Sequence, residues 1–219
     1  RSVSAFDAQT GVRLWQIQRP GDALVLRRGG VLQAVGNTLV AGVSGRLMGL
    51  NPSYGAVLWE SAIATPRGTN DIERLVDLVA GVGRQGDEVC VRAFQATVAC
   101  VDAKRGVTSW KHSADGSVGL AADAQRVYGV EEDGRVLAWQ RIGGEQSWRF
   151  DGLRYRQPGA PLVFGRAVVV GDASGLIHLL SNADGSLLSR LSTDGSSIDT
   201  TPVDAAGTLV VVTRRGVVF

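Results

Sequence analysis

Two histidines and two cysteines are the side chains here best suited to acid–base, metal or redox chemistry. His112 and His178 lie inside or beside segments with a strand pattern. They do not stand at metal-ligand spacing, and no serine occupies the G-x-S-x-G turn that would expose a nucleophile. We therefore expect each histidine to be a half-exposed strand residue and not a catalytic group.

The cysteines, Cys90 and Cys100, each lie five residues from Gln95. If "VCV" (89–91) and "ACV" (99–101) are neighbouring strands, a hairpin centred on Gln95 places the two cysteines opposite each other. Opposed strand residues have Cα atoms about 4.5–5.5 Å apart, which is within reach of a disulfide. An oxidising compartment would favour that bond, whereas free thiols would be small core residues. The sequence leaves both states open and predicts no redox function.

A recurring twelve-residue frame supplies the elements that hold these side chains. A polar residue stands at the fourth position and glycine at the eighth, and four copies end in tryptophan: Trp15, Trp59, Trp110 and Trp148. The last copy ends in Ser189. The copies are "SAFDAQTGVRLW" (4–15), "MGLNPSYGAVLW" (48–59), "ACVDAKRGVTSW" (99–110), "LAWQRIGGEQSW" (137–148) and "HLLSNADGSLLS" (178–189).

Each frame predicts a β-hairpin, because Asp or Asn bonds its own turn and glycine accepts a positive φ. Two more alternating segments precede each copy, so every repeat contains four strands. Repeated four-stranded units of about 40 residues are typical of a β-propeller, in which the recurring tryptophan would pack between neighbouring blades. We expect an all-β chain forming part of one propeller, with about five blades of a probable eight. The expected units are a half blade at 1–18, blades at about 30–63, 76–113, 117–150 and 159–192, and a partial blade at 199–219.

Charge and hydropathy exclude two broad classes of function. The net charge is +2, and the 23 basic residues are scattered along the chain. Nucleic-acid binding needs basic residues gathered on one face, so we expect no nucleic-acid partner. No apolar run approaches the roughly 20 residues that cross a bilayer. We therefore expect no segment of this chain to cross a membrane.

Two segments between the repeats help to distinguish the families that share this repeat. The repeat itself resembles the tryptophan-docking repeat of propellers of the pyrroloquinoline quinone (PQQ) type, which includes dehydrogenases and a non-catalytic family, the BamB propeller lipoproteins of outer-membrane assembly. "LVLR" (24–27) and "GTNDIERLVDL" (68–78) resemble two loops of the BamB family, and "VVVGDASGLIHLL" with "TTPV" resembles its last blades. Arg28 and Val79 depart from that family's pattern, where glycine and a second acidic residue are expected.

The resemblance implies a non-catalytic scaffold at the periplasmic face of the outer membrane, without cofactor or metal, and in contact with the membrane only through a lipid anchor outside this chain. It would bind the POTRA domains of the barrel-inserting subunit, assist the folding and insertion of outer-membrane β-barrels, and have unfolded outer-membrane proteins as further clients. Leu24, Leu26 and Arg27 would anchor the partner, and Glu73 and Asp77 would contribute from the neighbouring loop. Two other interpretations stay open: the leucines fold back onto the rim, and the acidic loop is simply solvated.

The alternative from another class is a fragment of a PQQ-dependent periplasmic dehydrogenase. Such an enzyme needs an Asp base, a Ca²⁺ site of carboxylate and amide oxygens, and commonly a pair of adjacent cysteines. Cys90 and Cys100 are ten residues apart, and the sequence has only four asparagines. Because no set of oxygens stands at metal-ligand spacing, we expect no enzyme activity.

Overall fold

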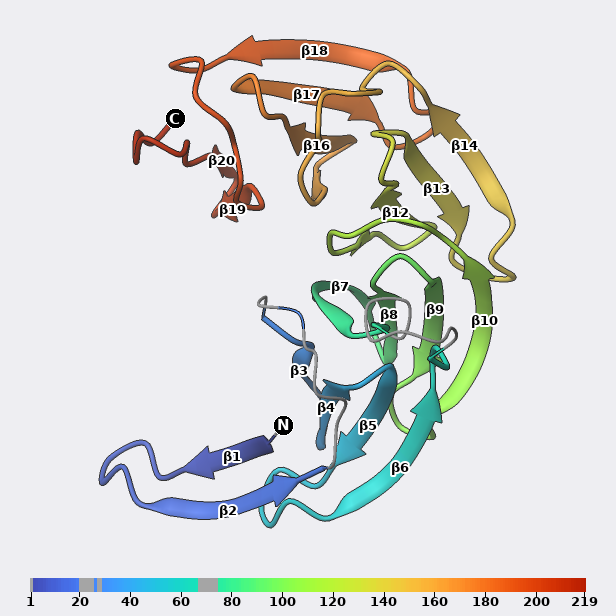
Figure 1. Ribbon diagram of the computed structural model, residues 1–219, viewed down its shortest axis with the longest axis vertical. Coiled ribbons are helices and arrows are strands. Elements are labelled where there is room, and N and C mark those ends of the chain that lie inside the picture. The colour runs from blue at the N-terminus through green and yellow to red at the C-terminus, as the bar shows by residue number, and fades with distance from the viewer. Residues whose placement is uncertain (1, 20–25, 27–28, 67–74) are drawn as a thin grey trace.

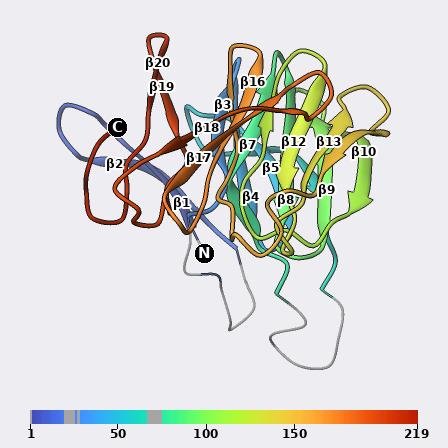
Figure 2. The same cartoon turned by 90° about the horizontal axis from the view of Figure 1, so that it is seen from above.

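The computed structural model describes residues 2–19, 26, 29–66 and 75–219, and all regular structure in these ranges is β. The sheets are arranged around a common axis as an open ring (Figure 1). Seen from the side, the strands run between two faces of this ring, so the described turns between strands lie on one face or the other (Figure 2). The predicted all-β propeller with antiparallel four-stranded sheets is confirmed in these ranges.

Four sheets have four strands, which follow one another in chain order from the inside of the ring to the outside. The first contains β3 (Leu32–Val35), β4 (Thr38–Val43), β5 (Arg46–Leu50) and β6 (Val57–Ala62). The second contains β7 (Leu78–Gln85), β8 (Glu88–Ala93), β9 (Thr97–Asp102) and β10 (Val107–Ser113). The third contains β11 (Ala121–Ala122), β12 (Arg126–Val130), β13 (Val136–Gln140) and β14 (Gln146–Phe150). The fourth contains β15 (Leu162–Phe164), β16 (Ala167–Gly171), β17 (Leu176–Ser181) and β18 (Leu187–Ser192).

A two-stranded sheet stands at each open end of the ring (Figure 1). One pairs β1 (Ser2–Phe6) with β2 (Arg13–Gln18), and the other pairs β19 (Val203–Ala205) with β20 (Thr208–Val210). β1–β2 carries the first copy of the frame, and its Asp7 accepts hydrogen bonds from Gln9 and Thr10 in the predicted way. The turn chemistry of the frame is therefore present even in this short hairpin.

The hydrophobic core lies between the sheets, not inside any one of them. The middle strands contact a neighbouring sheet on each face, so they are mostly apolar, and in β16 every residue is apolar and buried. Separate clusters join the first sheet to the second, the second to the third and the third to the fourth. Two further clusters join the first of these sheets to β1–β2 and the fourth to the segment containing β20, so each four-stranded sheet is stabilised from both faces.

The recurring tryptophans join neighbouring sheets in one repeated contact. The indole of Trp59 lies against Gly106 of the next sheet, where an added Cβ would meet the ring at 2.6 Å. Gly106 also has φ of +71°, so the turn and the close approach both require glycine. In each contact the indole N–H donates to a carbonyl of the next turn: Trp15 to Pro52 at 2.8 Å, Trp59 to Ala103 at 2.9 Å, Trp110 to Arg141 at 2.8 Å and Trp148 to Asn182 at 3.0 Å.

The two cysteines form a disulfide between β8 and β9. Cys90 pairs with Cys100 in the register of the hairpin, and Gln95 at its turn has a left-handed φ of 46°. The opposition predicted from the sequence is confirmed, and the structure selects the disulfide from the two states that were left open. Both cysteines are buried in the cluster between the second and third sheets.

Removal of this disulfide should destabilise the protein. The bond closes a loop between residues ten apart, and the chain-entropy model assigns about 3 kcal/mol to a loop of this size. We expect Cys90→Ala/Cys100→Ala to lose roughly that free energy of unfolding in urea denaturation. Wild-type protein that is unfolded and refolded with reductant serves as the control and should approach the variant. Equal stability of the oxidised and reduced wild-type proteins would contradict this prediction.

Candidate functional site

The site predicted from the sequence lies on the connections between sheets, and the structure describes two of its residues, Leu26 and Asp77. Leu24, Arg27 and Glu73 lie outside the described residues. The backbone N–H of Leu26 donates to Asp77 Oδ2 at 2.8 Å. This bond brings together residues 51 positions apart, from the connection between β2 and β3 and the connection between β6 and β7.

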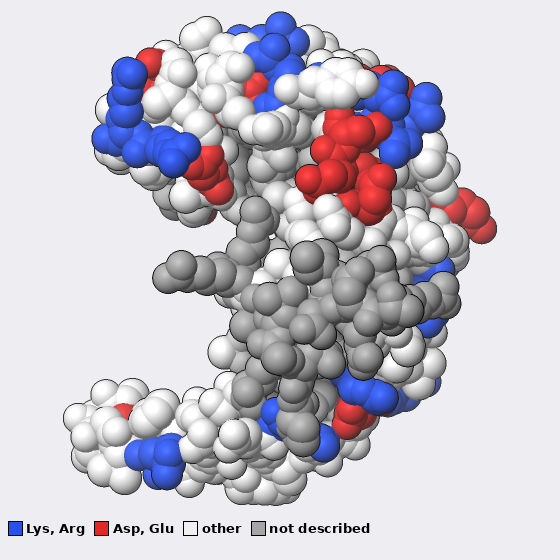
Figure 3. Space-filling model, viewed as in Figure 1, with Lys and Arg blue, Asp and Glu red and all other residues white. Residues whose placement is uncertain are grey.

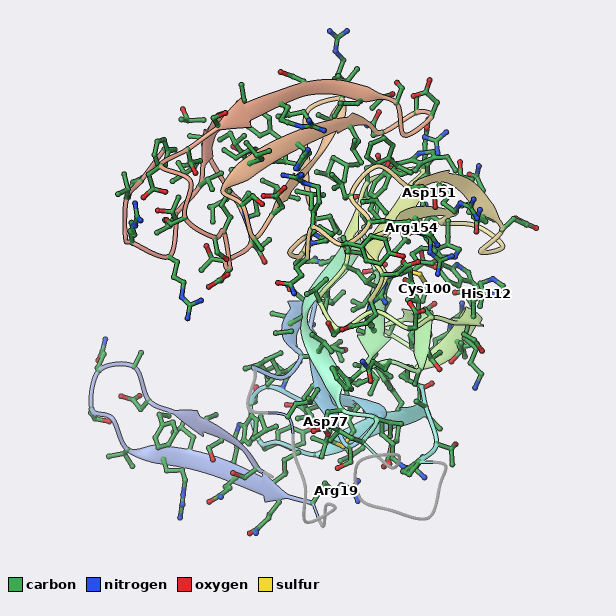
Figure 4. All side chains as sticks on the ribbon, turned by 45° about the horizontal axis from the view of Figure 1, so that its top comes forward. Arg19, Asp77, Cys100, His112, Asp151 and Arg154 are labelled. Atoms are coloured by element: carbon green, nitrogen blue, oxygen red, sulfur yellow. A yellow bond between two sulfur atoms is a disulfide. The ribbon has the colours of Figure 1, made fainter. Side chains whose placement is uncertain are left out.

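Asp77 directly precedes β7, and the first residues of that strand fix its place. Its carbonyl accepts a hydrogen bond from the Phe94 N–H at 2.9 Å, and the Ala80 N–H donates to Gly29 at 3.0 Å. Figure 4 shows Asp77 beside the inner strands of the first two sheets. Leu26 is half-buried and lines a cavity of about 490 Å³ with Asp77 and Leu78, together with Ser2–Ser4, Gly29–Leu32 and Gly42–Ser44.

The two departures from the family pattern have different outcomes. Val79 is 4% exposed and belongs to the hydrophobic core, so this position offers no charge to a partner. Arg28 lies outside the described residues. Electrostatic recognition near β7 would therefore have to come from Asp77 and from residues before it.

A buried ion pair, which the repeat pattern does not predict, connects the second and third sheets. Arg92 on β8 donates from Nη2 to Glu131 Oε1 at 2.9 Å, and neither side chain is more than 4% exposed. Glu131 Oε2 accepts a further bond from the Asp115 N–H at 2.7 Å. Nε and Nη1 of Arg92 have no hydrogen-bond partner among the described residues. An arginine within the apolar run "VCVRAF" (89–94) was the available signal.

The environment of Glu131 opposes its ionisation. Burial raises the pKa of Glu131, the hydrogen bond with the Asp115 side chain raises it further, and the charge of Arg92 acts in the opposite direction. Glu131 also lines an inner cavity of about 860 Å³ with Glu132 and Asp199, and no basic side chain lines this cavity in the described part of the chain. The ionised form of Glu131 is therefore stabilised by the charge of Arg92.

Acidic side chains gather near β12 and β13 on the face shown in Figure 3. Most of them are paired: Asp133 Oδ2 lies 2.8 Å from Arg135 Nε and 3.0 Å from Arg154 Nη2. Burial would raise the pKa of Asp133, but hydrogen bonds from these two arginines lower it to about 2. Figure 4 shows Arg154 and Asp151 on the connection after β14. This patch is a surface ion-pair network, and such pairs contribute little net affinity or stability.

His178 is fully buried, so the expectation of a half-exposed strand residue is wrong for this histidine. Its Nε2 bonds Asp172 Oδ2 at 2.8 Å, and Arg190 Nε donates to its Nδ1 at 3.2 Å. Arg156 Nε also donates to Asp172, at 2.6 Å. Because β17 packs against the third sheet on this face, the histidine becomes an interior polar group with hydrogen bonds to both ring nitrogens. His112, in contrast, is exposed and lies beside Trp110, with ring centroids 5.5 Å apart.

Buried His178 should make stability fall at mildly acidic pH. Burial lowers the pKa of His178 below its usual 6.5, although the hydrogen bond to Asp172 opposes this. Below about pH 6.5 the unfolded chain therefore binds a proton that the folded chain resists, and the free energy of unfolding decreases as pH falls. We expect His178→Gln to have a flatter profile in urea denaturations from pH 8 to pH 5. Parallel profiles for the two proteins would contradict this explanation.

One cluster in the described residues has metal-ligand types, and its chemistry does not fit a metal. Glu88, Cys90 and Cys100 lie close together, but both sulfurs are used in the disulfide and provide no thiolate. The three described asparagines, Asn37, Asn51 and Asn182, stand in or beside turns. No helix long and apolar enough to cross a bilayer occurs in the described part of the chain.

Comparisons with known proteins agree on one family. A family model described as the outer membrane protein assembly factor BamB matches residues 1–150. BamB of Bordetella pertussis is 35% identical over 216 residues, which cover 98% of this chain and 56% of that protein. BamB of Burkholderia pseudomallei is 36% identical over 219 residues, with 99% and 58% covered. The chain thus spans a little more than half the length of these relatives.

Solved structures show the same architecture. The crystal structure of BamB from Moraxella catarrhalis superposes with a TM-score of 0.90 at 25% identity, covering 99% of this chain and 65% of that one. A computationally designed protein, Ika8, reaches a TM-score of 0.72 at 19% identity, covering 98% of this chain and 63% of that one. The second likeness concerns the fold alone.

Proposed function

The chain belongs to the family of the outer membrane protein assembly factor BamB, and from this premise we propose that it is a non-catalytic scaffold in outer-membrane protein assembly. Its partner would be the POTRA domains of the barrel-inserting subunit, and unfolded outer-membrane proteins would be further clients. The relatives are named as assembly factors and not as enzymes, which favours the scaffold over a quinone-dependent dehydrogenase.

The observation that supports this proposal most is the hydrogen bond between Leu26 and Asp77. It brings one described residue of each of two inter-sheet connections into contact, and we propose that the residues expected on these connections act as one surface. Leu24, Leu26 and Arg27 would supply the apolar and guanidinium anchors that dominate interface energy. Glu73 and Asp77 would extend the surface from the second connection.

The disulfide supports the proposed location. Disulfides persist in oxidising compartments, of which the bacterial periplasm is one. Cys90 and Cys100 are bonded in the interior, at a contact between two sheets. A scaffold at the periplasmic face of the outer membrane, held by a lipid anchor, fits this chemistry.

Binding to a POTRA-domain fragment tests the proposal. We expect Arg27→Glu, and separately Leu24→Ala/Leu26→Ala, to weaken binding about tenfold or more, because each removes an anchor of the interface. Ile142→Ala is the matched control, since Ile142 is 82% exposed in the turn after β13, whereas Asp77 lies before the start of β7. In each four-stranded sheet the first and third strands run in the same direction. The turn after a third strand, where Ile142 lies, is therefore on the opposite face of the ring from the start of a first strand, where Asp77 lies. Undiminished binding by folded anchor variants would overturn the site.

A further inference from the structure

The carboxylate of Asp77 is directed toward the protein's own backbone. Its Oδ2 accepts the Leu26 N–H at 2.8 Å, and both residues are half-buried. A hydrogen bond to an ionised carboxylate is among the stronger kinds in proteins. The family resemblance implies that Asp77 contributes to the contact with the partner, and the hydrogen bond to Leu26 suggests that this contribution is indirect.

The backbone of Asp77, which carries the acceptor, is held by the first two four-stranded sheets. The main-chain carbonyl of Asp77 is bonded to Phe94 after β8, and the next residue, Leu78, is 4% exposed and begins β7. Leu78 also packs against Gly42 of the first sheet, where an added Cβ would meet its side chain at 3.0 Å. The position of the carboxylate is therefore set by the sheets. Asp77 directly precedes a strand, whereas Leu26 lies farther from one, in the connection that leads to β3 (Leu32–Val35).

We propose that Asp77 is a positioning residue, which holds the Leu26 backbone so that the Leu26 side chain is presented to the partner in one orientation. This inference rests on the proposed function, in which Leu26 is a contact. Fixing a binding segment before association reduces the entropy that binding must otherwise remove. In this role the Asp77 carboxylate accepts the Leu26 N–H, and the surface that meets the partner here is the leucine.

Two substitutions separate this role from a direct charge contact. Asp77→Asn keeps an oxygen that can accept the Leu26 N–H but has no charge, whereas Asp77→Ala keeps neither. If Asp77 positions Leu26, asparagine recovers most of what alanine loses. If Asp77 pairs with a basic group of the partner, both substitutions weaken binding alike.

The first measurement needs no partner. Hydrogen exchange of the residue 26 amide in the full-length protein should be about tenfold faster or more in Asp77→Ala than in wild type, since the acceptor is gone. Asp77→Asn should restore most of the protection. Asp184→Ala is the control, because Asp184 is an exposed turn aspartate before β18 that bonds Ser186. Unchanged exchange in Asp77→Ala would overturn the positioning role.

The second measurement is affinity for the POTRA-domain fragment. We expect Asp77→Ala to bind about tenfold more weakly, and Asp77→Asn to recover to within about threefold of wild type. Leu26→Ala should weaken binding while its amide stays protected. Equal losses in both Asp77 variants would reject the inference in favour of a direct charge contact. Failure of the proposed function would give a different result. In that case the wild type would not bind the POTRA-domain fragment, or Leu26→Ala would bind it as tightly as the wild type does.

Discussion

Trp148→Ala is expected to lower the free energy of unfolding by about 3–5 kcal/mol, the usual cost of truncating a buried tryptophan. Trp148 is 7% exposed, and its indole N–H donates to the Asn182 carbonyl at 3.0 Å in the next sheet. The ring also covers Gly185, where an added Cβ would lie 2.5 Å from it. Alanine would leave a cavity between the third and fourth sheets and would remove one of the two hydrogen bonds that the Asn182 carbonyl accepts, the other coming from the Tyr128 hydroxyl.

Trp15→Ala is the matched control in the same urea denaturation. Trp15 makes the equivalent bond to Pro52 at 2.8 Å, but its side chain is only half-buried, at the contact of β2 with the first four-stranded sheet. Because less apolar surface is removed from water at that contact, its loss should be clearly smaller. Equal losses at the two positions would show that burial between sheets is not the source of the effect.

Arg92→Ala should cost a similar free energy, about 3–5 kcal/mol, for an electrostatic reason. The substitution leaves Glu131 buried without its cation, since the pair is 0% and 4% exposed. Removal of one partner of a buried ion pair is strongly destabilising, whereas removal of both is much less so. We therefore expect Arg92→Met/Glu131→Gln to be more stable than Arg92→Met alone in urea denaturation.

The loss in Arg92→Ala should also depend on pH. Burial already raises the pKa of Glu131, and removal of the nearby charge of Arg92 would raise it further. At low pH the carboxyl is neutral in the folded variant, while at higher pH the folded state must either keep the proton or ionise the group in the interior. The destabilisation should therefore be larger at pH 8 than at pH 5. A loss that does not change with pH would contradict an electrostatic origin.

The repeated frame made the architecture predictable. Glycine at the eighth position and a polar residue at the fourth specify the turn locally, as Gly106 and Asp102 show. Such signals depend on the backbone of a few adjacent residues, so they can be recognised from one sequence alone. The opposition of Cys90 and Cys100 followed for the same reason, because a hairpin sets its own register.

Contacts between sheets were not predictable from the sequence. His178 was expected to be half-exposed, because one strand pattern does not tell which face a neighbouring sheet will cover. Arg92 and Glu131 are 39 residues apart and belong to different sheets, so no local pattern predicts their pairing. Local patterns did not identify the candidate site either. Its residues were identified by a family resemblance, and of these only Leu26 and Asp77 are among the residues that the structure describes.

The sequence by itself determined the strands, the turns and the spacing of the repeats, because these depend on φ, side-chain alternation and hydrogen bonds between near neighbours. It also determined that the cysteines face each other. The tertiary structure alone decided which polar groups are buried, which charges are paired and where the carboxylate of Asp77 points. Those outcomes depend on how separate sheets pack around the axis, and burial and Coulomb energy act between atoms that are close in space, however far apart they are in the chain.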